Sequence, residues 1–129
     1  MTVKRVFSDA PWESVHGYCR AVRSGPYIAV SGTTAVGEDG KVIAPEDPYL
    51  QAQRCIRIIQ DALAACDAGL SDVVRTRIYL TDIDDWQAVA KAHAEAFGEH
   101  PPASTMLETS RLIDPAMRLE MEADAVVAD

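Results

Sequence analysis

Residues 47–69 read DPYLQAQRCIRIIQDALAACDAG, and this stretch predicts the longest helix of the chain. Asp47 can cap the first turn, and Pro48 suits the first helical position. Apolar side chains then recur at spacings of three and four, at Ala52, Cys55, Ile56, Ile59, Ala62, Leu63 and Cys66. This spacing gives the helix one apolar face that must be buried. Gly69 is expected to end the helix.

The segments on both sides of this helix predict a sheet. Residues from Asp82 to Phe97 form a second amphipathic pattern, with Trp86, Val89, Ala90, His93 and Phe97 on one face. The expected strands cover residues 3–7, 17–22, 26–30, 74–80, 103–109 and 118–127. Ser31 and Gly32 are expected to stop the third of these strands. This order predicts a single α+β domain over 1–129, with two helices on one face of a mixed sheet.

Side-chain alternation divides the two faces of this sheet. We assign the apolar sets to the helix-covered face, namely Val74, Thr76, Ile78 and Leu80 on one strand and Leu119, Met121, Ala123 and Ala125 on another. The opposite face carries Arg75, Arg77 and Tyr79 beside Glu120, Glu122 and Asp124. This second face is either solvated or buried between subunits with its charges paired.

Composition excludes several classes of protein. The chain has 129 residues and a net charge of −8, and its basic residues are scattered, so we expect no nucleic-acid partner. No apolar run approaches 18 residues and the N-terminus lacks a signal sequence, so we expect no membrane association and a cytoplasmic location. The three cysteines have no metal-ligand spacing, which predicts no metal site.

The order and spacing of several short motifs resemble the Rid family of YjgF-like reactive-intermediate deaminases, whose older label is the L-PSP endoribonuclease family. The matching segments are Gly17-Tyr18, residues 28–32, Ala68-Gly69-Leu70, residues 73–76, residues 80–82, Phe97, residues 101–103, Glu108, Arg111-Leu112 and residues 120–123. The resemblance implies a chorismate-mutase-like fold and a homotrimer whose sheets form a central barrel. It also implies clefts between neighbouring subunits that bind small metabolites. Family enzymes hydrolyse enamines and imines, such as 2-aminoacrylate, without a metal or an organic cofactor.

The resemblance also implies the site residues. Glu120 occupies the position of the family glutamate that positions water, a role suited to general acid–base catalysis. The alternative is a structural carboxylate paired with Arg75 or Arg77. Tyr18 matches a family tyrosine that contacts substrate, and the alternative is a tyrosine that only packs. Ser31 and Gly32 match a turn at the floor of the cleft, and the alternative is a turn that only ends a strand.

The largest departure from the family lies at Ser104, where the family motif Pro-Ala-Arg-Ser places an arginine that grips the substrate carboxylate. Thr105 and Met106 follow it, and we expect all three residues to contact substrate. A serine lacks the charge and the bidentate fork of arginine, so we expect inefficient hydrolysis of 2-aminoacrylate. The helix position that is often Asn in the family is Ala90 here. Arg20 and Arg77 are candidates to replace the lost arginine only if they reach the cleft. Arg111 matches a family arginine outside the carboxylate grip, so we expect its role to be structural.

Other residues leave alternatives open. His93 fits a core or interface histidine better than a catalytic one, and His16 borders the cleft or lies in a surface loop. Glu108 lines the cleft or pairs with Arg111. The leading hypothesis is a cofactor-free hydrolase or deaminase of enamines, imines or related metabolites with altered specificity. The alternatives are a non-catalytic small-molecule-binding or sensor trimer and, third, an endoribonuclease.

Overall fold

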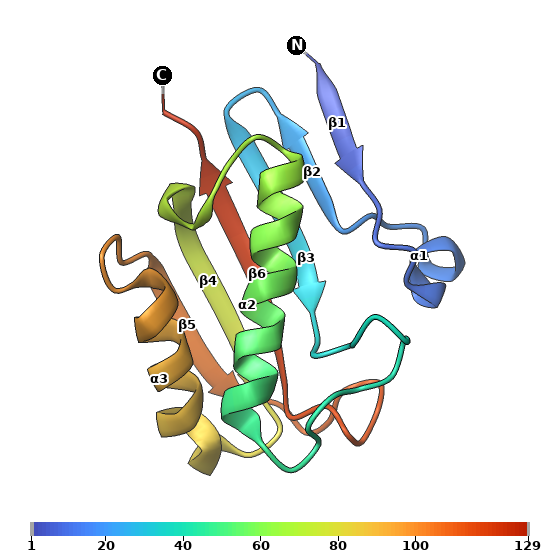
Figure 1. Ribbon diagram of the computed structural model, residues 1–129, viewed down its shortest axis with the longest axis vertical. Helices are drawn as coiled ribbons and strands as arrows, with labels where there is room; N and C mark the ends of the chain where they lie inside the picture. Colours follow the sequence, from blue (N-terminus) through green and yellow to red (C-terminus); the bar gives the residue numbers. More distant parts are fainter. Residues whose placement is uncertain (1, 129) are drawn as a thin grey trace.

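The computed structural model describes residues 2–128, which form one six-stranded sheet with helices on one of its faces (Figure 1). The strands are β1 (Val3–Val6), β2 (Ala21–Ser24), β3 (Tyr27–Thr33), β4 (Val73–Leu80), β5 (Ala103–Glu108) and β6 (Leu119–Val126). Their spatial order is β1-β2-β3-β6-β4-β5. Neighbouring strands are antiparallel except β4 and β5, which are parallel.

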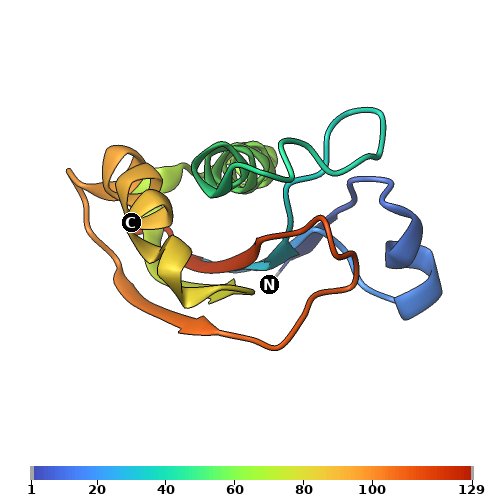
Figure 2. The same ribbon diagram turned by 90° about the horizontal axis from the view of Figure 1, so that it is seen from below.

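Two helices, α2 (Pro48–Ala65) and α3 (Trp86–Phe97), lie side by side over the same face of the sheet (Figure 2). Short 3₁₀ turns, η1 (Leu70–Asp72) and η2 (Ile83–Asp85), precede β4 and α3. The α+β fold with two helices on one face of a mixed sheet is therefore confirmed. Among residues 2–128, no helix is both long enough and apolar enough to span a membrane.

The boundaries of α2 follow local chemistry. Asp47 caps the helix by accepting a hydrogen bond from Leu50 N at 3.0 Å, and Pro48 takes the first position. The predicted stop at Gly69 is wrong, because α2 already ends at Ala65. Asp67 turns the chain with a φ of 60°, a left-handed conformation that aspartate tolerates better than most residues.

The N-terminal region differs most from its prediction. A short helix, α1 (Pro11–His16), precedes β2 and was not expected. The strand expected over 17–22 instead begins at Ala21, because Gly17 takes a φ of 81° at the end of α1 and redirects the chain. Placing α1 beside the sheet brings its side chains to the edge of the site described below (Figure 1).

Two irregularities correct the expected strand patterns. The strand β3 continues through Ser31 and Gly32 to Thr33, and its pairing with β6 shifts register between Val30 and Thr33. The pairing of β4 with β6 shifts between Val73 and Arg75, so Val73 is buried while Val74 is 48% exposed. Val74 was wrongly assigned to the helix face, because a bulge breaks strict alternation.

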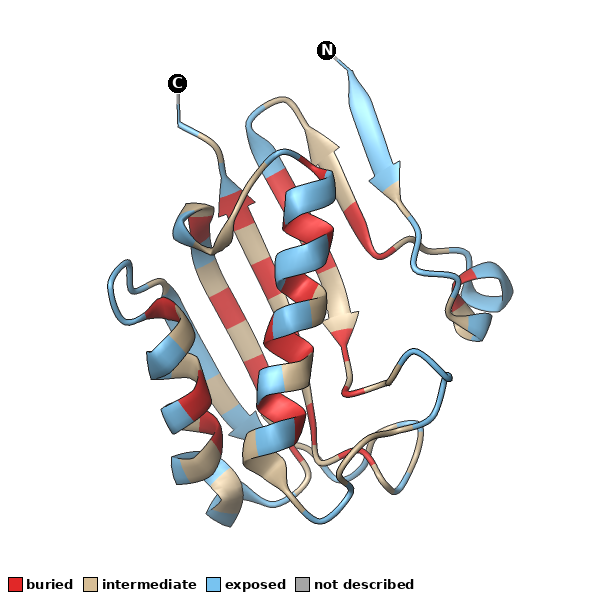
Figure 3. Cartoon of the chain, in the orientation of Figure 1, coloured by how far each residue is buried: buried red, intermediate tan, exposed pale blue. Residues whose placement is uncertain are grey.

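The core lies between α2 and the sheet, where buried residues form a stripe along the helix (Figure 3). Cys55 and Cys66 belong to this stripe as free thiols, as their spacing predicted. One buried polar residue of α2, Gln51, fastens two loops to the helix. Its side chain donates to the carbonyl oxygens of Ile43 and Ala116 and accepts from Arg118 N at 2.8 Å.

Candidate functional site

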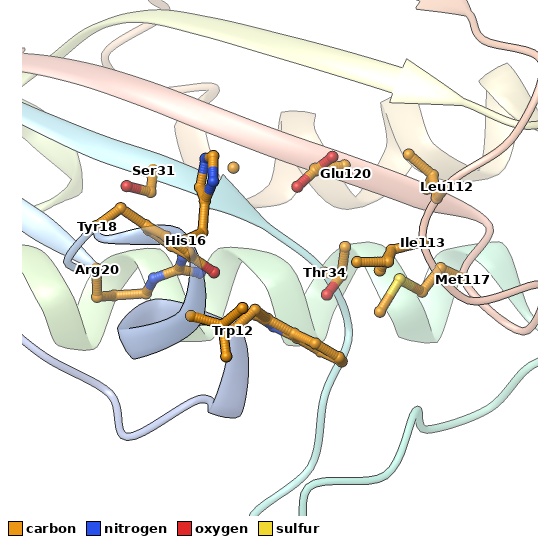
Figure 4. Close-up of a pocket in the computed structure, with 12 residues that line it drawn as sticks. Trp12, His16, Tyr18, Arg20, Ser31, Thr34, Leu112, Ile113, Met117 and Glu120 are labelled. Atoms are coloured by element: carbon orange, nitrogen blue, oxygen red, sulfur yellow. The ribbon is translucent and has the colours of Figure 1, made fainter.

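A cavity of about 600 Å³ opens where β3 and β6 approach α1 and the loop before β6 (Figure 4). Its polar lining consists of His16, Tyr18, Arg20, Ser31, Gly32, Thr34 and Glu120. Its apolar lining consists of Trp12, Val15, Leu112, Ile113 and Met117. The structure thus brings four of the predicted site residues, Tyr18, Ser31, Gly32 and Glu120, into one cavity.

Glu120 stands at the second position of β6, and its carboxylate has no hydrogen bond or ion pair among residues 2–128. Burial raises the pKa of its carboxyl above the usual value; the Arg20 guanidinium opposes this rise and the Glu122 carboxylate adds to it. Arg77, one possible partner, instead pairs with Asp124 at 3.0 Å and Glu122 at 3.3 Å. The Glu120 carboxylate is therefore available to a ligand.

Gly32 makes room for this carboxylate. A Cβ atom at position 32 would lie 2.5 Å from Glu120 Oε2 and 2.9 Å from Cδ, which is closer than real Cβ atoms approach. The register shift in β3 places Gly32 there, opposite the acidic side of β6. Beside it, the Ser31 hydroxyl donates to Cys19 O at 2.7 Å, so only its acceptor capacity remains for a ligand.

Arg20 contributes a buried cation to the same cavity. Only 7% of the residue is exposed, and Nη1 donates to Thr33 Oγ1 at 3.3 Å. The buried Nε atom has no hydrogen-bond partner among the described residues, and no carboxylate there lies within ion-pair distance. The guanidinium carbon lies 5.6 Å from the centre of the Tyr18 ring. Of the two candidate arginines, Arg20 lines the cavity and Arg77 does not.

Aromatic and apolar side chains enclose the two ends of the cavity. The His16 ring meets the Tyr18 ring edge-on with 5.4 Å between centroids, so His16 borders the cavity. Burial raises the pKa of the Tyr18 hydroxyl, which therefore remains a hydrogen-bond donor at neutral pH. Trp12 and Met117 close the opposite side. Sequence patterns did not indicate these two, because α1 and the loop before β6 have no periodicity.

The loop before β6 is held firmly although it lacks regular structure. Arg118 forms an ion pair with Asp85, with Nη2 2.9 Å from Oδ2, and its backbone amide bonds to Gln51. These bonds fix the apolar wall formed by Leu112, Ile113 and Met117 relative to α2. The predicted family landmark Arg111-Leu112 therefore marks this wall, although only Leu112 lines the cavity.

The other predicted contact residues, Ser104, Thr105 and Met106, lie on β5 at the edge of the sheet, away from the cavity of their own chain. Ser104 Oγ lies 2.8 Å from Thr76 Oγ1, which is 2.9 Å from His93 Nε2. These bonds place the Ser104 side chain on the helix-covered face, whereas Glu120 points to the opposite face.

His93 joins α3 to β4 through this bond to Thr76 and packs against Phe97 with 4.6 Å between ring centroids. Burial lowers the pKa of its imidazole, so the ring is neutral near pH 7. Glu108 accepts a hydrogen bond from Ile83 N at 3.0 Å and does not border the cavity. Neither residue meets Glu120 within the chain.

The described residues contain no group of three or more His, Cys, Asp or Glu side chains that could hold a metal ion. The cavity instead combines one free carboxylate, one free guanidinium and neutral hydrogen-bonding groups. Such a set can bind a small organic molecule and exchange a proton with it.

Comparisons with known proteins place the chain in a family. The family described as Endoribonuclease L-PSP matches residues 7–127. An uncharacterised protein of Streptomyces coelicolor is 36% identical over 123 residues, covering 95% of this chain and 91% of that protein. A RutC family protein of Pyrococcus abyssi is 31% identical, covering 97% and 98%.

A solved structure is similar to this chain over nearly its whole length. The crystal structure of a YjgF/YER057c/UK114 family member from Mycobacterium tuberculosis shares 44% identity and a TM-score of 0.89, and the match covers 98% of this chain and 100% of that one. The chain therefore belongs to the Endoribonuclease L-PSP family, which is the Rid or YjgF-like family that its motifs indicated.

Proposed function

We propose that this protein is a cofactor-free hydrolase that converts small enamines or imines to carbonyl compounds and ammonia. The observation that carries the proposal is Glu120, a partly buried carboxylate without a partner among residues 2–128, held over Gly32 at the wall of a cavity. A free carboxylate whose pKa is raised by burial can both accept and return a proton during a reaction. Family membership supports a small-molecule substrate for this cavity.

The chemistry needs one water and one proton-transfer group. Glu120 accepts a proton from water as the water oxygen bonds to the carbon of the protonated imine, giving a neutral carbinolamine. Glu120 returns this proton to the nitrogen, and the C–N bond breaks so that ammonia leaves. The hydroxyl gives its remaining proton to Glu120 as the carbonyl forms, and Glu120 passes that proton to solvent. Tyr18 donates a hydrogen bond to the substrate, and Ser31 accepts one. An enamine enters the same sequence after protonation of its carbon gives the protonated imine.

The active unit in this proposal is a homotrimer with its sites between subunits. Ser104, Thr105 and Met106 are remote from the cavity of their own chain, so they contact substrate only if a neighbouring subunit presents them. The uncovered sheet face supports association, because it exposes Tyr27, Val74, Leu107 and Val126 by 41–48%. Large apolar side chains exposed on one face are typical of an interface.

The deciding experiment measures ammonia release from imines generated freshly in the assay. We expect Glu120→Gln to lower kcat/KM by about 10²- to 10⁴-fold, which is the usual contribution of general acid–base catalysis. The matched control is Glu99→Gln, since Glu99 is exposed and outside the cavity. Full activity in Glu120→Gln would contradict the proposed catalytic role of Glu120. Binding of substrate without turnover by the wild type would favour the sensor function.

Ser104 supplies a second readout of the same proposal. The serine hydroxyl lacks the charge-assisted bond of an arginine, so we expect Ser104→Arg to raise kcat/KM for 2-aminoacrylate about 10- to 100-fold. High wild-type activity on 2-aminoacrylate that Ser104→Arg leaves unchanged would contradict the proposed change in specificity.

The family description does not extend our proposal to RNA cleavage. A net charge of −8 opposes the approach of a polyanion, and the Arg20 cation of the cavity lies in a buried position near an acidic residue. Salt-sensitive RNA binding at low micromolar protein concentration would overturn this view.

A further inference from the structure

The Arg20 guanidinium lacks the anion that a buried cation requires. Burying a charge without a partner is costly, and proteins normally compensate it with a carboxylate or a complete set of hydrogen bonds. Arg20 is 93% buried, and its side chain makes polar contacts only with the neutral groups of Thr33 and Tyr18, while its buried Nε has no hydrogen-bond partner among residues 2–128. A ligand that supplies an anion would complete this arrangement.

Arg20 borders three cavities, and their linings differ. The second cavity, of about 470 Å³, lies between α1 and the loop 34–40 and also contains Arg54. However, Asp9 and Glu38 line it too, and Arg54 Nε already donates to Val36 O at 2.8 Å. These two carboxylates offset the two arginines there. The third cavity, of about 230 Å³, contains Arg20, Arg54 and Asp61, and it is the smallest of the three. The cavity that contains Glu120 has one carboxylate, whose pKa burial has raised, so it accepts an anion more easily.

The shape of the Glu120 cavity indicates what accompanies the anion. Trp12 on α1 faces Ile113 and Met117 from the loop before β6 in the close-up view (Figure 4). Ile113 is 73% exposed although it is large and apolar. Apolar walls of this kind are stabilised when an apolar group displaces water from them. Arg20 and Glu120 thus border a chamber that suits more than a three-carbon substrate.

We propose that Arg20 holds the substrate carboxylate, and that the substrate is the imine or enamine of a 2-oxo acid with a bulky apolar side chain. The inference rests on the proposed hydrolase function. The guanidinium fixes the carboxylate end, the apolar wall takes the side chain, and the C=N carbon lies within reach of the Glu120 carboxylate. Arg20 thereby replaces, from within the same chain, the charge that is missing at Ser104.

The experiment measures binding of reaction products, so it requires no turnover. Trp12 fluorescence is titrated in a Trp86→Phe background, because Trp86 lies on α3 and does not line the cavity. The probes are 4-methyl-2-oxopentanoate, its primary amide, and pyruvate. We expect the acid to bind ~10- to 100-fold more tightly than its amide, as expected for a charged hydrogen bond. We expect pyruvate to bind about tenfold or more weakly, since it buries three fewer carbons.

Variants then assign the anion to Arg20. Arg20→Gln should abolish the preference for acid over amide, and Arg20→Lys should keep part of it. Arg57→Gln is the matched control, because it removes one positive charge from an exposed helix position that is 3.1 Å from Asp61. Arg54→Gln should leave the affinity unchanged. Arg54 lines both the second and the third cavity, so a loss there would move the anion to one of these and overturn the proposal.

Two outcomes contradict the inference without reference to any variant: equal affinity of the wild type for acid and amide, or tighter binding of pyruvate than of the larger acid. The wild-type comparison therefore tests the inference even if Arg20→Gln does not fold. The hydrolase proposal can fail independently of this inference. In that case Glu120→Gln would retain turnover, while binding of 4-methyl-2-oxopentanoate would still depend on Arg20.

Discussion

The Glu120 carboxyl carries a cost to folding as well as a proposed role in catalysis. Burial is the largest effect on its pKa, and it raises the pKa above the ordinary value of 4.5. The folded state therefore holds this proton to a higher pH than the unfolded chain does. It follows that the free energy of unfolding decreases as pH rises from 4.5 through the folded pKa, and stays reduced above it.

The stability of Glu120→Gln tests this consequence. Glutamine has nearly the same shape and stays neutral, so the variant should be more stable than the wild type at about pH 7.5. The difference should shrink at about pH 4, where the wild-type carboxyl is protonated. Urea unfolding at the two pH values measures it, with Glu99→Gln as the exposed control. A difference that is the same at both pH values would contradict the assigned cause.

Gly32 shows how one missing side chain positions another. In Gly32→Ala the new Cβ would meet Glu120 Oε2 at 2.5 Å, and the flexible carboxylate would turn aside because the backbone cannot. We expect roughly 100-fold lower activity, typical of a misplaced catalytic group, with a change in unfolding free energy below about 1 kcal/mol. Gly69→Ala is the control, because a Cβ atom at position 69 would meet nothing within 4 Å. Wild-type activity in Gly32→Ala would show that the contact is unimportant.

At the scale of elements, α2 supports the site through Gln51 as well as through its apolar face. The Gln51 amide bonds to Ile43 O at 3.0 Å and Ala116 O at 2.9 Å, and its oxygen accepts from Arg118 N. These bonds fasten the loop that carries the apolar wall of the cavity. The helix pattern did not indicate these loop contacts, because they depend on a residue 67 positions away.

Removing this amide should loosen the loop. Gln51→Ala leaves several buried backbone groups without partners, so we expect a loss of about 2–4 kcal/mol in unfolding free energy. The exposed Gln60 on the same helix gives the control Gln60→Ala, which should change stability by less than about 0.5 kcal/mol. Denaturant unfolding measures both variants, and equal stability of the two would contradict the structural role of Gln51.

At the scale of the whole molecule, the open face of the sheet is the surface through which the proposed trimer would form. It combines the ion pairs of Arg77 with exposed Tyr27, Val74 and Leu107. Such a mixture of apolar area and paired charge suits contact with identical subunits more than contact with water. The proposed trimer would cover this face and bring β5 to the cavity of a neighbour.

The mass in solution tests the trimer. Three chains of 14.0 kDa give a mass of 42 kDa, which light scattering after gel filtration measures. Leu107→Glu puts a charge on the open face and should lower the mass toward 14.0 kDa, together with activity. Leu50→Glu is the matched control, since Leu50 is similarly exposed but lies on α2. A monomeric wild type with full activity would overturn the proposed assembly.

The sequence alone determined the features that depend on neighbours along the chain. The spacing of Cys55, Ile59 and Leu63 predicted the buried face of α2, and Asp47 predicted its start, because helix periodicity and capping act within a few residues. Alternation along β6 separated Leu119 from Glu120 correctly, since that strand is regular. The short motifs were sufficient to indicate the family. Alternation failed at Val74, where a bulge adds one residue.

The tertiary structure decided what depends on segments far apart in the sequence. Whether Arg20 finds an anion depends on where β3, α1 and α2 come together, and no local pattern records that. The approach of Gly32 to Glu120 and the apolar wall near Met117 likewise arise from packing across the sheet. The sequence analysis expected Ser104 to contact the same substrate as Glu120, yet within one chain its side chain lies on the opposite face of the sheet from Glu120. The register of the strands fixes these relations, and that register follows from the burial of the whole sheet.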